Sequence, residues 1–195
     1  MRSLSIYILA GGNSSRMGQD KGLLLLDQRS IMETILDECK HITSSIYILT
    51  ANEKYAAFNY PLIPDSIQHI GPAGGIDAML RHTQTENNLI ISCDMPFVTH
   101  AAMLELISLQ EDHDITIPMF HDYPEAMFGL YKKRCKNKWR EQIEKGIHKM
   151  SIIISHFTHN FVDGKCLEKK YPKLFTNINT PEELKQAQQW RKQLP

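Results

Sequence analysis

The stretch LSIYILAGGNSSRMGQDKGLLLL, residues 4–26, decides how this chain folds. It begins with the apolar, β-branched segment Ser5–Leu9, which favours a buried strand. It then changes to small and polar residues around two glycines, followed by Arg16 and the pair Asp20-Lys21. This second part is too rich in glycine for a helix and too polar for a core. We therefore predict a loop that directly follows the first strand.

Short apolar segments alternate with longer amphipathic ones along the rest of the chain, which is typical of an α/β domain with a mainly parallel sheet. Further strands are predicted at residues 46–49, 62–63, 89–93, 115–117 and 126–131. Helices are predicted at residues 30–41, 53–58, 73–83, 100–110 and 134–145, and residues 151–155 fit either structure. Near the C-terminus, Thr180, Pro181 and Glu183 predict a capping box and a last helix. No boundary is visible, so we expect residues 1–195 to form a single domain.

Composition excludes several classes of protein. The 195 residues are enough to bury a core, and 22 basic residues balance 22 acidic ones. With no net charge, neither nucleic acid nor a membrane surface is an expected partner. No segment approaches the roughly 18–20 apolar residues that span a bilayer, and no secretory pattern is present, so we expect a cytoplasmic protein. The cysteines show no CxxC spacing, which favours reduced thiols at Cys39, Cys93, Cys135 and Cys166.

The loop at residues 10–22 has the residue types of an anion site. In a parallel α/β sheet, ligands bind beyond the carboxyl ends of the strands, where this loop would lie. Gly11 and Gly12 allow backbone N–H groups to approach a ligand, Arg16 offers a planar fork to phosphate oxygens, and Lys21 adds a compact charge. Neither GxxxxGK[ST] nor GxGxxG is present. The residues alone leave open a di- or triphosphate site or a solvated loop.

An acidic residue follows the predicted strand at residues 89–93. Asp94 would lie at the same edge of the sheet as the glycine-rich loop. Mg²⁺ binds through one or two carboxylates together with phosphate oxygens and water, so Asp94 is a candidate metal ligand. A turn-forming Asp ahead of Pro96 would explain the same residue. Cys93 is better explained as a small buried strand residue than as a nucleophile.

Three segments carry a resemblance to a known family: LAGGNSSRMGQDK at residues 9–21, CDMPF at residues 93–97 and NINTPEEL at residues 177–184. The first resembles the LAGG-x-S-x-RMG-x-DK loop of the Rossmann-like nucleotidyltransferases. Within that group the chain is most similar to the molybdenum cofactor guanylyltransferases. The resemblance implies a three-layer α/β/α Rossmann-like fold. It also implies transfer of GMP from GTP to the terminal phosphate of molybdopterin with Mg²⁺, and transient contact with other proteins of molybdenum cofactor synthesis.

The resemblance also assigns roles to particular residues. The residues implied to be catalytic are Arg16, Lys21 and Asp94, of which Asp94 also holds the metal. The residues implied to bind GTP are Leu9, Ala10, Gly11, Gly12, Lys21, Asn52, Asp65 and Asp94. The residues implied to face the pterin are Lys149, Asn177 and Asn179, although Asx turns and the capping box explain the two asparagines equally well.

Some positions depart from the family pattern. Thr50 stands in place of the first Asn of an N-x-N segment, and Ala73-Gly74 replace Leu-Ala in a GP-[LAI]-[AG]-G segment, whose glycines we expect to let the backbone approach the base. Two other functions stay open: a related transferase that uses CTP or a sugar-1-phosphate, and a nucleotide-binding protein without catalysis. His156 and His159 lie three residues apart but lack a third metal ligand, so we expect surface residues there.

Overall fold

A central β-sheet organises the protein in the computed structural model, which describes residues 3–11, 20–67 and 69–193. The strand order is β10-β7-β9-β6-β1-β4-β5, with β8 paired to β7 beside this path. The strands are β1 (Leu4–Leu9), β4 (Ile46–Leu49), β5 (Leu62–Ile63), β6 (Asn87–Ser92), β7 (Ile115–Phe120), β8 (Tyr123–Pro124), β9 (Phe128–Lys132) and β10 (His159–Asp163).

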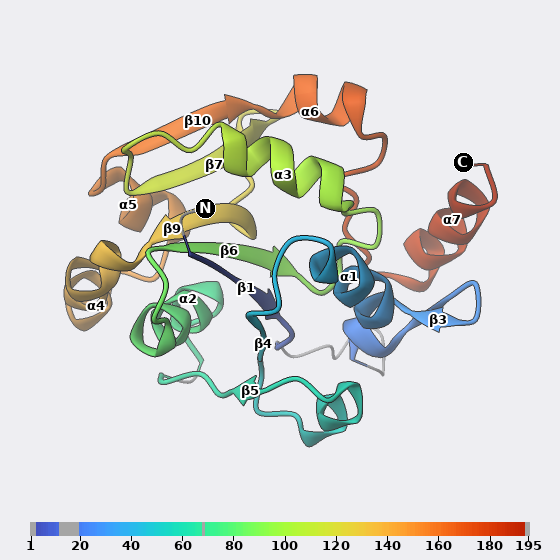
Figure 1. The fold of residues 1–195 in the computed structure, drawn as a ribbon, viewed down its shortest axis with the longest axis horizontal. Coiled ribbons are helices and arrows are strands. Elements are labelled where there is room, and N and C mark those ends of the chain that lie inside the picture. The colour runs from blue at the N-terminus through green and yellow to red at the C-terminus, as the bar shows by residue number, and fades with distance from the viewer. Residues whose placement is uncertain (1–2, 12–19, 68, 194–195) are drawn as a thin grey trace.

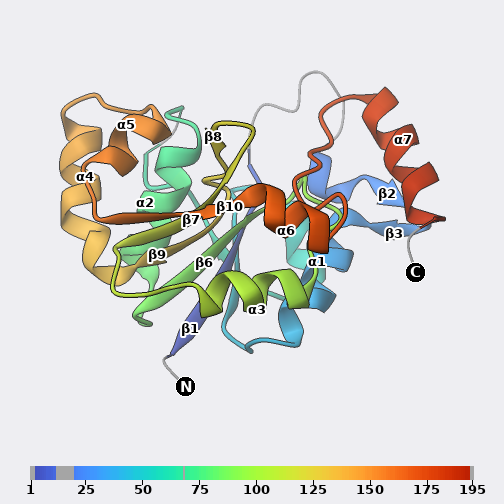
Figure 2. The same ribbon diagram turned by 90° about the horizontal axis from the view of Figure 1, so that it is seen from above.

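Helices cover both faces of this sheet (Figures 1 and 2). One face packs against α1 (Ile31–Lys40), α3 (His100–Ser108) and α6 (Gly164–Lys170), with α7 (Pro181–Arg191) and the hairpin β2–β3 (Leu25–Leu26 and Arg29–Ser30) beside them. The other face packs against α2 (Pro72–His82), α4 (Lys136–Glu144) and α5 (Met150–Ser155). Alternate residues of β1 enter the two cores, Ile6 and Ile8 on one side and Tyr7 on the other. The predicted three-layer α/β/α architecture is confirmed.

The sheet is mainly parallel, as expected, but its two halves differ. Strands β6, β1, β4 and β5 run parallel to one another, whereas β9 is antiparallel to both of its neighbours, β6 and β7. Leu9 is paired with Leu49 on one side and with Ser92 on the other. The carboxyl ends of β1, β4 and β6 therefore meet at one edge, where the predicted site residues follow them.

Most predicted elements are present within a few residues of their expected ends. The last helix begins with the predicted capping box, in which Thr180 Oγ1 accepts a hydrogen bond from the Glu183 N–H at 3.2 Å and Glu183 Oε2 accepts one from the Thr180 N–H at 2.9 Å. The ambiguous segment at residues 151–155 is helical. Strand β10 and helix α6, which lie between that helix and α7, are not predicted from the sequence.

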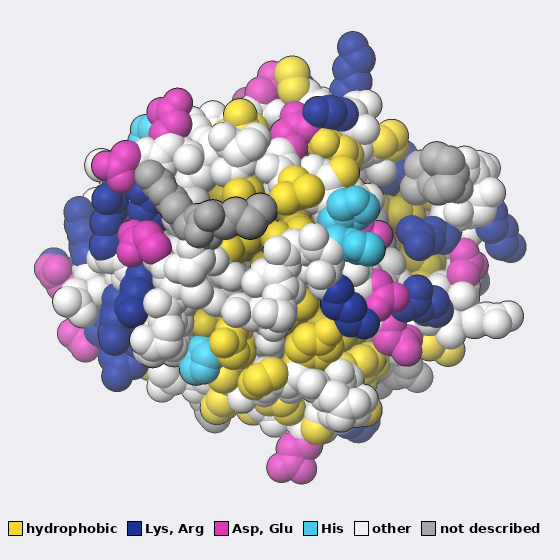
Figure 3. Space-filling view, in the orientation of Figure 1, with side chains coloured by type: hydrophobic (Ala, Val, Ile, Leu, Met, Phe, Trp, Pro, Cys, Tyr) yellow, Lys and Arg dark blue, Asp and Glu magenta, His cyan; other side chains and the backbone are white. Residues whose placement is uncertain are grey.

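The surface carries charges of both signs (Figure 3), and the cysteines differ in burial. Within the described residues, no helix combines the length and the hydropathy needed to cross a membrane. On the face shown in Figure 3, Lys and Arg side chains gather at the left margin, over α4, with acidic side chains among them. The cysteines are free thiols, as predicted. Cys39, Cys93 and Cys135 are buried, and Cys166 is exposed.

Candidate active site

Three polar side chains from distant parts of the chain meet at the carboxyl edge of the sheet. The ammonium of Lys21 lies 2.9 Å from Asp94 Oδ2 and also donates a hydrogen bond to Asn179 Oδ1. The Lys21 and Asp94 side chains are only 25% and 14% exposed, so water screens this ion pair less than a surface pair. Lys21, Asp94 and Asn179 form what we call the charged corner. Two predicted catalytic residues and one predicted pterin-side residue are therefore neighbours.

Backbone hydrogen bonds fix Asp94 in the charged corner. The Cys93 N–H donates to the Leu9 carbonyl at 3.0 Å, which joins the end of β6 to the end of β1. The Ile178 N–H donates to the Asp94 carbonyl at 3.0 Å, which attaches the segment ahead of α7. The Ser92 hydroxyl donates to Asp94 Oδ1 at 2.6 Å. Both carboxylate oxygens of Asp94 thus accept a hydrogen bond, and the side chain is held in one orientation.

A hollow of about 640 Å³ lies at the ends of β1, β4 and β5. It is lined by Leu9, Ala10, Gly11, Asn52 and Asp65, which are the described residues predicted to bind GTP apart from Lys21 and Asp94. A cavity of this size accommodates a small organic ligand. The predicted residues Gly12 and Arg16 lie outside the described residues, and their roles stay predictions.

Asp65 brings a carboxylate into the hollow directly after β5. The residue is half-buried, and burial raises the pKa of its carboxyl group. Among the described residues, its side chain has no hydrogen-bond partner or ion-pair partner. A partly desolvated carboxylate that lacks a partner can accept hydrogen bonds from N–H or O–H groups of a ligand.

Asp20 is a site residue to which the sequence analysis gave no role. Its carboxylate accepts hydrogen bonds from the Tyr55 hydroxyl, from the Gly22 N–H at 3.3 Å and from the Asn52 amide at 3.1 Å. Tyr55 is fully buried, and burial raises the pKa of its hydroxyl, so Tyr55 stays a neutral donor. Asp20 lines the hollow and immediately precedes Lys21. Asp20 therefore connects the hollow to the charged corner. In the sequence, only its position next to Lys21 indicates such a role.

The glycines at residues 71–75 divide between two tasks, and our expectation that they let the backbone approach the base is corrected for Gly74 and Gly75 only. Gly71 has a φ of 64°, lines the hollow and forms the N-cap of α2. Gly74 and Gly75 are buried in the first turns of the helix. A Cβ on Gly74 would lie 2.7 Å from the Ile67 carbonyl oxygen, and one on Gly75 would overlap the Leu9 side chain. These two glycines permit close packing, because the helix lies against the end of β1.

The residues predicted to face the pterin have different surroundings. The backbone N–H of Asn179 donates to Glu183 Oε2 at 2.6 Å, whereas its side chain reaches Lys21, so local capping and participation in the site occur together. Asn177 is half-buried two residues earlier. Lys149 is exposed as the N-cap of α5 and forms no ion pair with the described residues. Only Asn179 joins the charged corner through a direct contact.

Glu125 is a second residue that the sequence analysis missed. Ile91 pairs with Phe128 across strands β6 and β9, and the Ser92 N–H donates to the Met127 carbonyl at 2.9 Å. Both segments turn beyond these pairs, and Asp94 and Glu125 lie just outside the ends of the two strands. Burial raises the pKa of the Glu125 carboxyl group, and the negative charge of Asp94 raises it further. The turn ahead of β9 thus brings a second acid near Asp94.

The charged corner offers oxygen donors of the kind that Mg²⁺ prefers. Asp94 Oδ2 and Asn179 Oδ1 both face the Lys21 ammonium, so a positive charge already lies between two oxygen atoms. Among the described residues, no three His, Cys, Asp or Glu side chains are grouped so that they could hold a metal ion. A cation held by Asp94 would therefore complete its shell with water and phosphate oxygens, as Mg²⁺ commonly does. The donor set fits a magnesium ion that binds together with a nucleotide.

Comparisons with known proteins agree with this geometry. Residues 6–159 match the family described as the MobA-like NTP transferase domain. The chain is 35% identical over 185 residues to a "probable molybdenum cofactor guanylyltransferase" of Flavobacterium johnsoniae, covering 94% of this chain and 96% of the relative. It is 34% identical over 187 residues to the molybdenum cofactor guanylyltransferase of Vibrio campbellii, covering 93% of each.

Solved structures show the same relationship. Molybdopterin-guanine dinucleotide biosynthesis protein A of Archaeoglobus fulgidus superposes with a TM-score of 0.83 at 26% identity, covering 97% of this chain and 100% of that one. The 4-diphosphocytidyl-2C-methyl-D-erythritol synthase of Anaerococcus prevotii shares the fold, with a TM-score of 0.73 at 13% identity over 98% of this chain and 99% of that one. The chain is an α/β nucleotidyltransferase and belongs to the MobA-like family that includes the molybdenum cofactor guanylyltransferases.

Proposed function

We propose that this chain transfers GMP from GTP to the terminal phosphate of molybdopterin, which yields molybdopterin guanine dinucleotide and pyrophosphate. The names of the relatives that share about a third of its residues over nearly the whole chain support this reaction. The structural observation that carries the proposal is the charged corner beside the hollow, because it joins a cation and a carboxylate to a space for a nucleotide.

The reaction is a displacement at the α-phosphorus of GTP. An oxygen of the acceptor phosphate forms the new P–O bond, and the bond from the α-phosphorus to the bridging oxygen breaks, so that its electron pair leaves with pyrophosphate. A phosphate monoester is already anionic, and the attack therefore needs no strong general base. Catalysis then consists mainly of positioning the reactants and neutralising charge.

The described residues divide these tasks among them. Lys21 neutralises charge that develops on the departing phosphates, and Asp94 and Asn179 would hold Mg²⁺. When it is bound, Mg²⁺ supplies positive charge to the phosphate oxygens. The backbone of Ala10 and Gly11 borders the phosphates at the end of β1, and Asp65 accepts hydrogen bonds from the nucleoside.

The remaining residues are assigned to a substrate but not to a particular atom of it. The Asn52 amide already donates to Asp20 and accepts from the Lys54 N–H at 3.1 Å, which leaves one N–H and one lone pair for a nucleotide. Arg16 would add a second cation to the phosphates, and Asn177 and Lys149 would meet the pterin substrate. We also propose that the protein works in the cytoplasm and exchanges the pterin through transient contacts with other proteins of the same synthesis.

A direct assay tests this function. The purified chain is incubated with Mg²⁺, molybdopterin and each of GTP, CTP, ATP and UTP, and both pyrophosphate and the dinucleotide product are measured. We expect turnover with GTP, and a thermal shift that is largest with GTP because a bound ligand stabilises the folded state. Turnover with CTP, or with a sugar-1-phosphate in place of molybdopterin, would identify a different transferase. A thermal shift without turnover would indicate a binding protein.

A further inference from the structure

A buried carboxylate of α2 has no part in the chemistry proposed above. Asp77 is fully buried, and its two oxygens accept hydrogen bonds from the Arg140 guanidinium of α4, from Nε to Oδ1 at 3.0 Å and from Nη2 to Oδ2. The Ser66 hydroxyl also donates to Asp77 Oδ2, and it accepts from Arg140 Nη2 at 3.1 Å. Each of the three side chains thus contacts the other two. We call Ser66, Asp77 and Arg140 the Asp77 triad.

The segment that directly follows β5 lies along the first turns of α2. A Cβ on Gly75 would lie 3.6 Å from Asp65 Oδ1, and a Cβ on Gly74 would lie 2.7 Å from the Ile67 carbonyl oxygen. The residue between them, Ser66, is bound to the buried carboxylate of the same helix. Three consecutive residues after the strand are therefore laid against one helix.

Helix geometry explains how Asp77 reaches this segment. Residues three and four apart share a face of an α-helix, and their side chains lean toward its N-terminus. Asp77 follows Gly74 by three residues, so its carboxylate leans back toward the turn against which Ile67 lies. The missing side chain at Gly74 leaves room for the Ile67 carbonyl, and the acid one turn later binds Ser66.

The Asp77 triad anchors the backbone next to a residue of the hollow. Asp65 lines the hollow, and within the described part of the chain its carboxylate has no hydrogen-bond partner. The direction of this side chain therefore depends on the backbone on either side of it. Pro64 restricts that backbone on one side through its ring, and Ser66 is held on the other side by two hydrogen bonds.

Holding the two helices together does not require the Asp77 triad. Residues of α2 and α4 already share one apolar core, and the Trp139 indole N–H donates to the Ala73 carbonyl at 3.1 Å. A buried ion pair adds little net stability, because the cost of removing both charges from water offsets their attraction. What the planar fork of Arg140 adds is direction, since it fixes both oxygens of Asp77 and the Ser66 hydroxyl at once.

We propose that Arg140 and Asp77 are positioning residues for the nucleotide, which hold Ser66 so that the neighbouring Asp65 faces the hollow before the nucleotide arrives. Both lie outside the lining of the hollow and act through the backbone. An acceptor that is oriented in advance avoids the cost of ordering it on binding, so the Asp77 triad should govern affinity rather than the rate of transfer. The inference rests on the proposed function, because it takes the hollow to bind the nucleotide.

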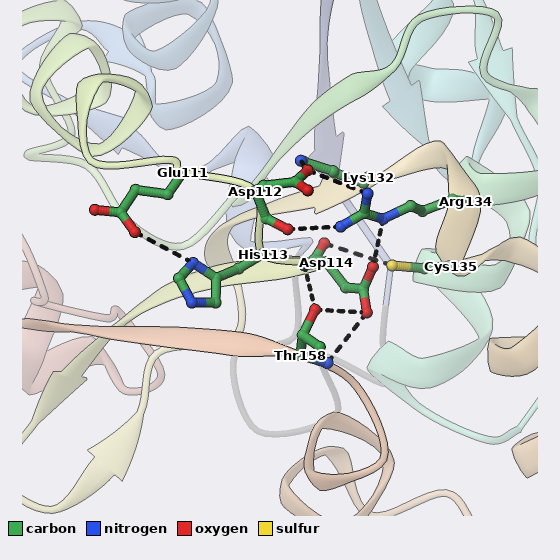
Figure 4. Close-up of polar contacts among 8 residues, drawn as sticks. All are labelled: Glu111, Asp112, His113, Asp114, Lys132, Arg134, Cys135 and Thr158. Atoms are coloured by element: carbon green, nitrogen blue, oxygen red, sulfur yellow. Dashed lines mark hydrogen bonds and ion pairs between the residues drawn. The ribbon is translucent and has the colours of Figure 1, made fainter.

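A second triad of the same chemistry provides a control within the same chain (Figure 4). Asp114 Oδ1 accepts a hydrogen bond from Arg134 Nε, and Asp114 Oδ2 accepts one from the Thr158 hydroxyl at 2.8 Å. Asp114 directly precedes β7, which runs in the same direction as β1 because β9 is antiparallel to both β6 and β7. This second triad therefore lies at the edge of the sheet opposite to the hollow.

Nucleotide titration by calorimetry tests the role of the Asp77 triad. Ser66→Ala removes one hydroxyl from an exposed residue and keeps the Asp77–Arg140 pair, so the fold should be retained. We expect Kd to rise about fivefold for the nucleotide that binds the wild type best, with kcat nearly unchanged. Arg140→Lys keeps the charge, loses the fork and should have a similar effect. The matched changes in the second triad, Thr158→Val and Arg134→Lys, should leave Kd at the wild-type value.

A double-mutant cycle separates positioning of Asp65 from a general structural effect. If Ser66 acts through Asp65, Ser66→Ala should cause no further loss of affinity in an Asp65→Asn background, whereas independent effects would multiply. Multiplied losses, or a wild-type Kd for Ser66→Ala, would overturn the inference and leave the proposed function in place. A wild type that binds none of GTP, CTP, ATP and UTP would overturn the proposed function and the inference together.

Discussion

The charged corner and the hollow are neighbours at one edge of the sheet, yet they are built differently. The charged corner consists of side chains whose partners are 73 and 158 residues apart in the chain, and its ion pair is nearly buried. The hollow is bordered largely by the segments that follow three neighbouring parallel strands. We infer that the charged corner determines the rate of transfer and that the hollow determines which nucleotide binds.

The largest expected effect comes from breaking the ion pair of the charged corner. Asp94→Asn and Lys21→Ala should each lower kcat by about 10²–10³-fold, the usual loss when one group that stabilises transition-state charge is removed. GTP affinity should change far less. The measurements are steady-state pyrophosphate release and GTP titration by calorimetry.

A second Lys–Asp pair provides the control for these variants. Asp112 pairs with Lys132 at 2.6 Å, but its side chain is 88% exposed and lies in the loop ahead of β7. Asp112→Asn should leave kcat unchanged. If Asp94→Asn kept the wild-type rate, the charged corner would not govern transfer.

A smaller effect is expected when the third member of the charged corner is removed. Asn179→Ala takes one acceptor from Lys21, and we expect kcat to fall about tenfold, in line with the loss of one hydrogen bond to a charged group. Thr180→Ala, at the next residue, removes the N-cap of α7 and should cost about 1 kcal/mol of stability. Its kcat should stay near the wild-type value. Similar kinetics for the two variants would mean that the contact of the Asn179 side chain with Lys21 does not affect the rate.

The hollow should respond through affinity rather than rate. Asp65→Asn removes a charged acceptor, and we expect KM for GTP to rise about tenfold while kcat changes little. Because burial raises the pKa of Asp65 above its value in the unfolded chain, folding favours the protonated form, and this group stabilises the fold less as pH rises through that pKa. Asp65→Asn should therefore not lower the melting temperature at neutral pH.

The same pKa shift predicts how nucleotide binding depends on pH. Asp65 accepts hydrogen bonds from GTP most strongly when it is ionised, and its raised pKa means that it takes up a proton at a higher pH than an ordinary aspartate. GTP affinity of the wild type should fall on acidification through that pKa, and Asp65→Asn should lose this dependence. An identical pH profile for both proteins would exclude Asp65 from the nucleotide contact.

The smallest effect is expected for the link between the two regions. Tyr55→Phe removes one donor from Asp20 without changing the volume of the core much. We expect a loss of about 1 kcal/mol in stability and only a few-fold drop in kcat, since Gly22 and Asn52 still hold Asp20. Chemical denaturation and kinetics measure the two quantities. An unchanged kcat would mean that Asp20 does not orient Lys21.

The parts of the fold that follow local patterns could be predicted from the sequence. The apolar segment at residues 5–9 and the capping box at Thr180 depend on neighbouring residues, and both appear as expected. Strand β10 could not be predicted in this way. It lies at an edge, and its sequence HNFVD buries only Val162, so it shows no clear alternation of apolar and polar residues.

The candidate site likewise has some features that the sequence predicts and others that it does not. That Asp94 would lie near the glycine-rich loop followed from its place after a parallel strand, which the sequence indicated. The contact of Lys21 with Asn179, the hydrogen bond from Tyr55 to Asp20 and the approach of Glu125 depend on tertiary packing, and no spacing in the chain encodes them. Gly74 and Gly75 were expected to contact the ligand, but they permit helix packing instead. The sequence does not show which neighbour approaches a glycine, and that neighbour decides its role.

The hydrogen bond from Ile178 to the Asp94 carbonyl has a practical consequence for handling the protein. It ties the entry to α7 to the backbone of Asp94 in the charged corner, so trimming that helix, or pulling on it with a fused partner, would disturb the charged corner. Strand β1 starts at the opposite end of the sheet, as Figure 2 shows. Affinity tags and surface tethers therefore belong on the N-terminal side.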